Sequence, residues 1–177
     1  MDSERPSQGG FAAFLLAQVG AQAAKRFGER LEPLGMTPPQ AGILRMLTRC
    51  GGLSQRDLAE RLGIHPSRLV ALLDEMETAG LLVREANSGD RRLYSLQLTA
   101  AGRERMAELG RVAREHNEAL CGALTSEERV ELETLLTRIA QAQGLTPGVH
   151  PGYSSLGKGE GQSRKLSKRG QDLRIRK

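Results

Sequence analysis

Apolar residues recur every three or four positions over most of this 177-residue sequence, which is the spacing of one face of an α-helix. The first such stripe predicts a long amphipathic helix ending near residues 33–35, and it consists of Phe11, Leu15, Val19, Ala23, Phe27 and Leu31. A second helix is expected after Thr37, because a capping oxygen is followed by Pro38 at the first helical position. Ile43, Leu44 and Leu47 give this helix a buried face.

Two shorter helices separated by a tight turn are predicted next. Ser54 caps the first of them, and the Asp57 carboxylate is expected to reach back to the cap as in a capping box. Only the residues 63–65 separate this helix from Pro66, which opens a helix that runs to Gly80. A turn this short forces the two helices to cross steeply, as in a helix-turn-helix.

A hairpin and two further helices complete the pattern. Residues 81–85 and 94–98 read as strands, and residues 86–92 between them have the composition of a turn. Thr99 caps a helix expected to run to about Cys121, and Thr125 with Glu128 forms a capping box for a last helix. The predicted fold class is mainly α with a small β-hairpin wing. It is a winged helix-turn-helix with long N- and C-terminal helices outside it.

The composition divides the chain into three parts. Residues 1–10 are predicted to be flexible, and residues 11–143 form one domain with a lobe at about 37–98 and long helices at about 11–32 and 99–143. Residues 144–177 hold eight basic and two acidic residues, a net charge of 8 − 2 = +6, whereas the whole chain carries +5. The basicity therefore lies in this tail, which is predicted to be mostly disordered from Leu145 on. The tail either contacts DNA phosphates or only increases solubility.

The helix that opens at Pro66 has the chemistry of a DNA-reading helix. Its inner face is occupied by leucines, and Ser67, Arg68, Val70 and Ala71 lie on its outer face. Short side chains allow close approach to base edges, Arg68 is a long donor, and the helix dipole favours phosphate at this end. Three acidic residues at 74, 75 and 77 would repel phosphate, so only the first two turns are expected to enter a groove. An ordinary surface helix is the alternative.

The hairpin favours the DNA interpretation. Arg84, Arg91 and Arg92 cluster in one two-stranded ribbon, and Asp90 lies in the turn. Arginine suits narrow minor grooves, where the negative potential is enhanced. Asp90 is expected to accept backbone or guanidinium hydrogen bonds and so fix the tip. A solvated charged turn is the alternative, but its place directly after a helix-turn-helix favours DNA.

These segments together resemble the MarR family of bacterial transcription regulators. The resemblance rests on DLAERLGI, on AGLLVRE at the end of the next helix, on Asp90-Arg91-Arg92, and on LTAAG, with ALTSEERVELETLL further on. It covers roughly Phe11 to Gln143. It implies a homodimer whose first and last helices interlock, and whose two winged helices reach successive major grooves about 34 Å apart.

The resemblance also implies roles for single residues. Arg92 enters the minor groove with Asp90 as its partner in the wing, and Ser67, Arg68, Val70 and Ala71 face the major groove. Many relatives carry basic or polar residues where this chain has Ala71 and Glu75, so its base contacts are expected to be fewer. The full predicted DNA-binding set is Ser54, Gln55, His65, Pro66, Ser67, Arg68, Val70, Ala71, Arg84, Asp90, Arg91 and Arg92. The predicted dimerisation set is Phe11, Phe14, Leu15, Leu132, Leu135, Leu136 and Ile139, for which packing within one chain is the alternative.

The resemblance further implies a small phenolic or lipophilic effector bound between the dimerisation helices and the DNA-binding lobe. Phe27, Met36, Ile43 and Met46 could line such a pocket, although core packing is favoured for them. Cys50 and Cys121 form neither a disulfide framework nor a metal site and are expected to be small packing residues.

The remaining motifs favour a regulator over other classes of protein. No paired catalytic carboxylates, metal-ligand spacing, nucleophile motif or phosphate-binding glycine loop occurs, so neither an enzyme nor a cofactor is expected. No apolar run suits a membrane span, and a cytoplasmic protein is predicted. The predicted function is a dimeric repressor released by an effector. The alternatives are an architectural or anti-silencing DNA-binding protein and a protein-interaction module on the same fold.

Overall fold

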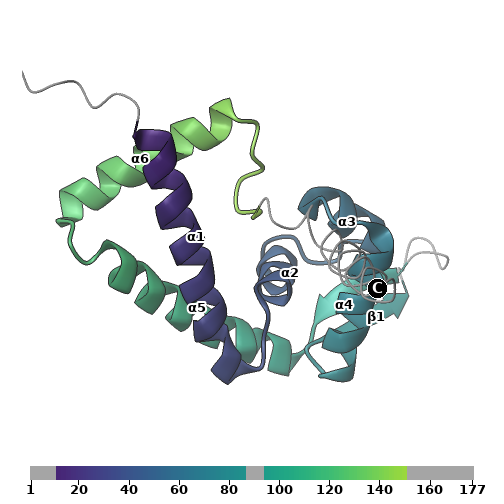
Figure 1. The fold of residues 1–177 in the computed structure, drawn as a ribbon. Helices are drawn as coiled ribbons and strands as arrows, with labels where there is room; N and C mark the ends of the chain where they lie inside the picture. Colours follow the sequence, from purple (N-terminus) through teal and green to yellow (C-terminus); the bar gives the residue numbers. More distant parts are fainter. Residues whose placement is uncertain (1–10, 87–93, 151–177) are drawn as a thin grey trace, which may run out of the picture.

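The computed structural model describes residues 11–86 and 94–150 of the chain (Figure 1). Its elements are α1 (Ala12–Leu31), the 3-10 helix η1 (Glu32–Leu34), α2 (Pro38–Arg49), α3 (Gln55–Leu62), α4 (Pro66–Thr78), β1 (Leu82–Ala86), β2 (Tyr94–Leu98), α5 (Ala100–Cys121) and α6 (Ser126–Ala142). The predicted fold class, mainly helical with one small hairpin, is confirmed.

The helices form two groups that α5 connects. α2, α3, α4 and the hairpin lie around the beginning of α5, whereas α1 packs along α5 and α6 follows at the far end of α5 (Figure 1). The hydrophobic core lies mainly in the first group, extends to the end of α1 and to α5, and is built mostly of leucine. Its fully buried large side chains are Leu31, Ile43, Leu44, Leu58, Leu69, Leu73, Met76, Leu82 and Leu96.

Side-chain caps fix where the helices begin. Glu128 and Thr125 bond reciprocally at the start of α6, so this predicted capping box is confirmed. The expectation for Asp57 differs in detail. Its N–H donates to Ser54 Oγ at 3.1 Å, but its carboxylate accepts from the Ser54 hydroxyl at 2.7 Å instead of from the Ser54 backbone. The shorter aspartate side chain still satisfies the hydroxyl, and the helix begins where predicted.

The hairpin is a two-stranded sheet that is hydrogen-bonded to the loop before α3. β1 and β2 pair antiparallel, with Leu82 opposite Leu98 and Ala86 opposite Tyr94. Leu96 N–H donates to Leu53 O at 2.9 Å, and Ser54 forms an isolated bridge with Ser95. The wing is therefore connected through backbone hydrogen bonds to the helix-turn-helix.

The start of α5 fits against the chain entering β1 only because position 102 is glycine. A Cβ built on Gly102 would lie 1.9 Å from the Leu81 carbonyl oxygen, which is a backbone atom. The same carbonyl accepts the Thr99 N–H at 3.2 Å, so it cannot easily move away. The glycine of the LTAAG segment thus fixes the close contact between α5 and the wing.

The structure describes only the first residues of the segment from Leu145 on, which was predicted to be mostly disordered. Residues Gly144–His150, which we call the C-terminal strap, leave α6 and return to α2 (Figure 1). Gly144 adopts a left-handed conformation with φ of 65°, which turns the chain. Val149 then packs against the core. This contact joins residues far apart in the sequence, so composition alone does not reveal it.

The outer parts of α1 and α6 carry large apolar side chains that this single chain leaves exposed. Phe14 is 61% exposed and Leu135 is 44% exposed, and Phe11, Leu15, Leu132, Leu136 and Ile139 are exposed as well. Packing within the same chain, the alternative for these stripes, does not bury them. Among the described residues, none of the helices has the length and apolarity needed to cross a membrane.

Candidate nucleic-acid interface

The N-terminal turns of α4 present the side chains expected to read DNA. Leu69, Leu72 and Leu73 are buried beneath them, so the helix is fixed by its inner face. His65 is the N-cap residue in extended conformation, and Pro66 follows at the first helical position. The outer face of these turns is consequently free to meet a ligand, and the Arg68 and Leu69 N–H groups at its end donate to the His65 carbonyl at 3.0 and 3.1 Å.

His65 and Ser67 contact each other. The Nδ1 atom of His65 lies 2.9 Å from Ser67 Oγ, and both side chains are exposed. The two were predicted as separate DNA contacts, whereas the structure holds the Ser67 hydroxyl in a defined position. A hydroxyl held in this way can donate to, or accept from, a group above the helix end.

Arg68, Val70 and Ala71 form the adjoining surface. Arg68 is exposed and makes no ion pair with any residue that the structure describes. Val70 and Ala71 are exposed beside it, so the side chains next to Arg68 are short and apolar. This combination allows close approach of a helix to a groove while one long donor extends beyond it.

Ser54 and Gln55 mark the start of α3. Ser54 is half-buried and already engaged with Asp57 and with the strand at Ser95. Gln55 is half-buried and lines a shallow hollow between α3 and α4 together with Pro66 and Val70. Of the two, Gln55 has the freer side chain for a contact outside the protein.

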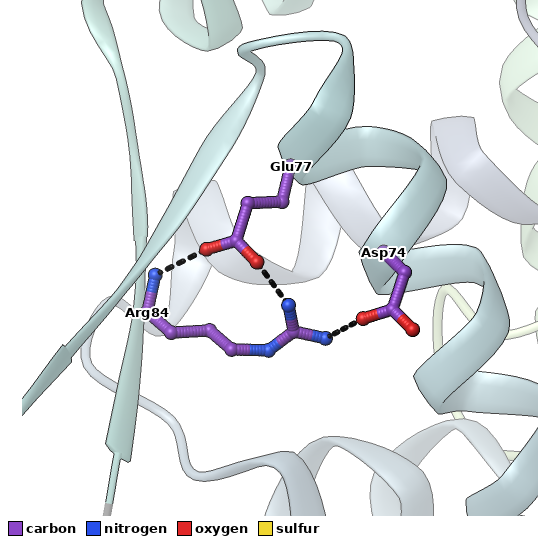
Figure 2. Close-up of polar contacts among 3 residues, drawn as sticks. All are labelled: Asp74, Glu77 and Arg84. Atoms are coloured by element: carbon purple, nitrogen blue, oxygen red, sulfur yellow. Dashed lines mark hydrogen bonds and ion pairs between the residues drawn. The ribbon is translucent and has the colours of Figure 1, made fainter.

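Arg84 is placed differently from the sequence prediction. Its backbone N–H donates to Glu77 Oε1 at 3.1 Å, its Nη1 bonds Glu77 Oε2, and its Nη2 lies 2.5 Å from Asp74 Oδ1 (Figure 2). Only 18% of the Arg84 side chain is exposed. Because both ends of the guanidinium face carboxylates of α4, we exclude Arg84 from the DNA-contacting set.

The sequence analysis did not predict the partners of Arg84. Asp74 and Glu77 were expected only to repel phosphate, but their contacts with Arg84 connect α4 to β1. The signal was present, since two acidic residues three positions apart lie on one helix face before a strand with an arginine. Glu75, the third acidic residue, accepts from Gln40 Nε2 of α2 at 3.1 Å. Asp90, Arg91 and Arg92 lie outside the described residues.

A cavity of about 980 Å³ lies between α1, α2 and α5. Phe27 of α1, Arg45 of α2 and Met106 of α5 line it, as do Gly148 and Val149 of the C-terminal strap. Of the four residues considered for such a pocket, Phe27 alone lines this cavity. Met36 and Ile43 are buried in the core and Met46 packs against it, which is the packing role favoured for them.

His116 of α5 packs against Phe27 at the edge of this region. The two ring centroids are 5.4 Å apart with the rings tilted by 54°. Burial lowers the pKa of His116 below its ordinary value, and the positive charges of Arg30 and Arg26 lower it further. The neutral imidazole is therefore favoured where α1 crosses α5.

Comparison with known proteins places this geometry in a family. Residues 34–93 match the model of the MarR family. HTH-type transcriptional repressor Rv2887 of Mycobacterium tuberculosis is 31% identical over 126 residues, which are 71% of this chain and 91% of the relative. The structure of transcriptional repressor CouR bound to a 23-mer DNA duplex is similar, with a TM-score of 0.67 and 29% identity, covering 79% of this chain and 99% of that one. The structure of Rv2887 in complex with p-aminosalicylic acid has a TM-score of 0.61 and 29% identity, covering 73% of this chain and 98% of that one. The chain therefore belongs to the MarR family of winged-helix transcriptional regulators.

Proposed function

We propose that the protein is a dimeric transcriptional repressor that binds a pseudo-palindromic DNA operator and leaves it when a small effector occupies the cavity beside α2. The observation that carries the proposal is the exposed Arg68 next to the His65–Ser67 pair at the start of a helix fixed by buried leucines. A repressor of the same family is seen on a DNA duplex. We propose a binding protein and not an enzyme, acting in the cytoplasm.

The start of α4 enters the major groove in this proposal. Arg68 bonds base edges, and Val70 and Ala71 allow the approach. His65, Pro66, Ser67 and Gln55 contact the phosphates and sugars at the rim of the groove. The wing, with Arg92 in the minor groove and Asp90 and Arg91 beside it, supplies the second part of the interface. Ser54 contributes by holding the start of α3.

Dimerisation covers the apolar faces of α1 and α6 in this proposal. Large exposed apolar surfaces on a protein in water mark interaction sites. A second copy is the occupant that matches both faces at once, because a two-fold axis pairs each surface with itself. Two copies of α4 then meet half-sites one helical turn apart, at about 34 Å.

The effector proposal rests on the cavity and on one relative. The cavity is lined mainly by apolar side chains, and Arg45 at its wall makes no ion pair with a described residue. An aromatic or aliphatic body with an acidic group matches this lining. Rv2887 has been seen in complex with p-aminosalicylic acid, which has that chemistry.

The salt dependence of DNA binding tests the wing contact. Arg92→Ala is expected to weaken binding to many sequences and to reduce the slope of log affinity against log salt by about one. Fluorescence anisotropy of a labelled duplex over a salt series measures both quantities, with Arg138→Ala on α6 as a control of equal charge. Unchanged affinity and slope in Arg92→Ala would contradict the wing assignment.

Release of DNA tests the effector. Increasing p-aminosalicylate is expected to lower the anisotropy of the complex of the full chain with its operator. Gly110→Leu is expected to prevent this release, because Gly110 lines the cavity and its nearest neighbour there is the flexible end of Arg114, 3.6 Å from an added Cβ. Equal release in both proteins would show that the ligand acts elsewhere.

A further inference from the structure

One wall of the cavity beside α2 does not come from a helix. α1, α2 and α5 supply three sides, and Gly148, Val149 and His150 of the C-terminal strap supply the remaining residues. These strap residues follow the last helix of the domain by only a few positions. The segment that follows α6 therefore returns toward α2 (Figure 1), and its residues 148–150 line the cavity there.

The strap is held in this position by several contacts. Leu145 N–H donates to Ala140 O at 3.0 Å, and Val149 N–H donates to Thr146 O at 3.1 Å, so the segment folds into two turns. The Val149 side chain packs against the hydrophobic core. The strap is thus seated by its backbone turns and by one apolar anchor.

Gly148 shows how closely the strap lies on α2. Its φ is +76°, and a Cβ added there would lie 3.1 Å from Arg49 Nη1 and 3.4 Å from Arg45 Nη2. A larger residue would therefore be strained and would push against both arginines. The strap therefore lies against the guanidinium group of Arg45, which lines the cavity, and against that of Arg49 beside it.

We propose that the C-terminal strap is a ligand-binding wall, which contacts the apolar body of an effector while Arg45 faces its acidic group. This inference rests on the proposed effector site and adds a binding element to it. Val149 is the residue that would touch the ligand, and Gly148 permits the strap to lie close enough. Ligand and strap then stabilise each other, because each covers apolar surface of the other.

Binding of the aromatic dye anilinonaphthalene sulfonate to the full chain tests the proposal. Val149→Ser is expected to weaken dye binding roughly tenfold, as removal of one or two methyl-sized groups from an apolar pocket does. Leu145→Ser is the matched control, because Leu145 lies in the same segment, does not line the cavity and is exposed. Gly110→Leu, which fills the cavity from α5, is expected to remove the binding in both backgrounds.

Amide hydrogen exchange gives a second readout that does not depend on dye affinity. Saturation with the dye is expected to slow exchange at Val149 in the wild-type chain and to leave it unchanged in Gly110→Leu. Equal dye affinity of Val149→Ser and wild type, or tighter binding by Val149→Ser, would overturn the strap as a binding wall. If Gly110→Leu still reduced binding in that case, the effector cavity itself would stand. If Gly110→Leu left dye binding unchanged in the wild-type and Val149→Ser backgrounds, both the effector cavity and the strap as its wall would be overturned.

Discussion

Arg84 of β1 and Glu77 of α4 bond each other twice, once through the Arg84 backbone N–H at 3.1 Å and once through the guanidinium (Figure 2). Asp74, one helical turn earlier, accepts from the other end of the same guanidinium. A single side chain of β1 therefore bonds two carboxylates of α4 and helps to fix the orientation of the strand on the helix. In a protein that reads a major and a minor groove at once, this orientation decides whether both contacts can form together.

Arg84→Ala is predicted to weaken DNA binding although Arg84 does not contact DNA in our proposal. The change leaves two carboxylates without their partner, and we expect unfolding to become easier by about 1–2 kcal/mol, since these carboxylates are partly exposed. Chemical denaturation and anisotropy measure the two effects, with Glu85→Gln on the exposed side of β1 as the control.

The double variant Asp74→Asn, Glu77→Gln distinguishes this role from simple repulsion of phosphate. It removes two negative charges from α4, and this loss of negative charge by itself would increase the affinity for DNA. If the ion pairs position the wing, the double variant loses stability as Arg84→Ala does, and its affinity for DNA does not rise. An increase in affinity with unchanged stability would mean that the two residues only repel the DNA.

Gly102→Ala is predicted to destabilise the protein by about 2–3 kcal/mol, because the added Cβ has no room beside the Leu81 carbonyl and the backbone must shift. Gly110→Ala on the same helix is the control, and it is expected to stabilise by about 0.5–1 kcal/mol because alanine is the better helix former. Thermal unfolding of both variants tests the contrast. Equal effects of the two changes would contradict the close packing of α5 on the wing.

Acidification is predicted to destabilise the protein in part through His116. Its pKa is lowered in the folded chain by burial and by Arg30 and Arg26, so the unfolded chain binds the proton more readily. The stability that His116 contributes is therefore full above its ordinary pKa and is lost as the pH falls below it. His116→Phe keeps the ring contact with Phe27 and should flatten the dependence of the melting temperature on pH between about 5 and 7. An unchanged pH dependence would contradict this account.

Leu135→Glu is predicted to break the dimer, because Leu135 is one of the apolar residues of α6 that a single chain leaves exposed. A charge buried at a two-fold interface occurs twice and meets its own copy. Sedimentation at micromolar concentration should show a dimer for wild type and for Gln141→Glu, which lies on the opposite face of α6, and a monomer for Leu135→Glu. A wild-type monomer under these conditions would exclude paired half-sites.

Much of the fold could be predicted because its boundaries are set by local chemistry. Thr37 before Pro38, Thr125 with Glu128, and Gly63 in the tight turn each act within three or four residues, so the sequence shows them directly. The stripes of leucine at helical spacing likewise indicated which faces are buried. The two strands were predicted to within one residue of their observed bounds, with β1 beginning at Leu82.

The parts that could not be predicted depend on contacts between elements. The sequence shows an arginine at position 84 in a basic hairpin, but its direction depends on the crossing of β1 over α4. Val149 looks like an isolated apolar residue in a polar tail until the strap is seen to return to α2. In both cases the partner lies on another element, and no local pattern shows which way the side chain points.

Selection of bound sites from random duplex DNA, performed in parallel with wild type, Arg68→Ala and the control Arg111→Ala, tests the central claim most directly. Our account predicts that wild type and Arg111→Ala enrich the same inverted repeat, with half-site centres about 10 base pairs apart. Arg68→Ala should relax the base preference at one position in each half-site while keeping their spacing. Sites without an inverted repeat, or the same base preference in Arg68→Ala as in wild type, would contradict the account.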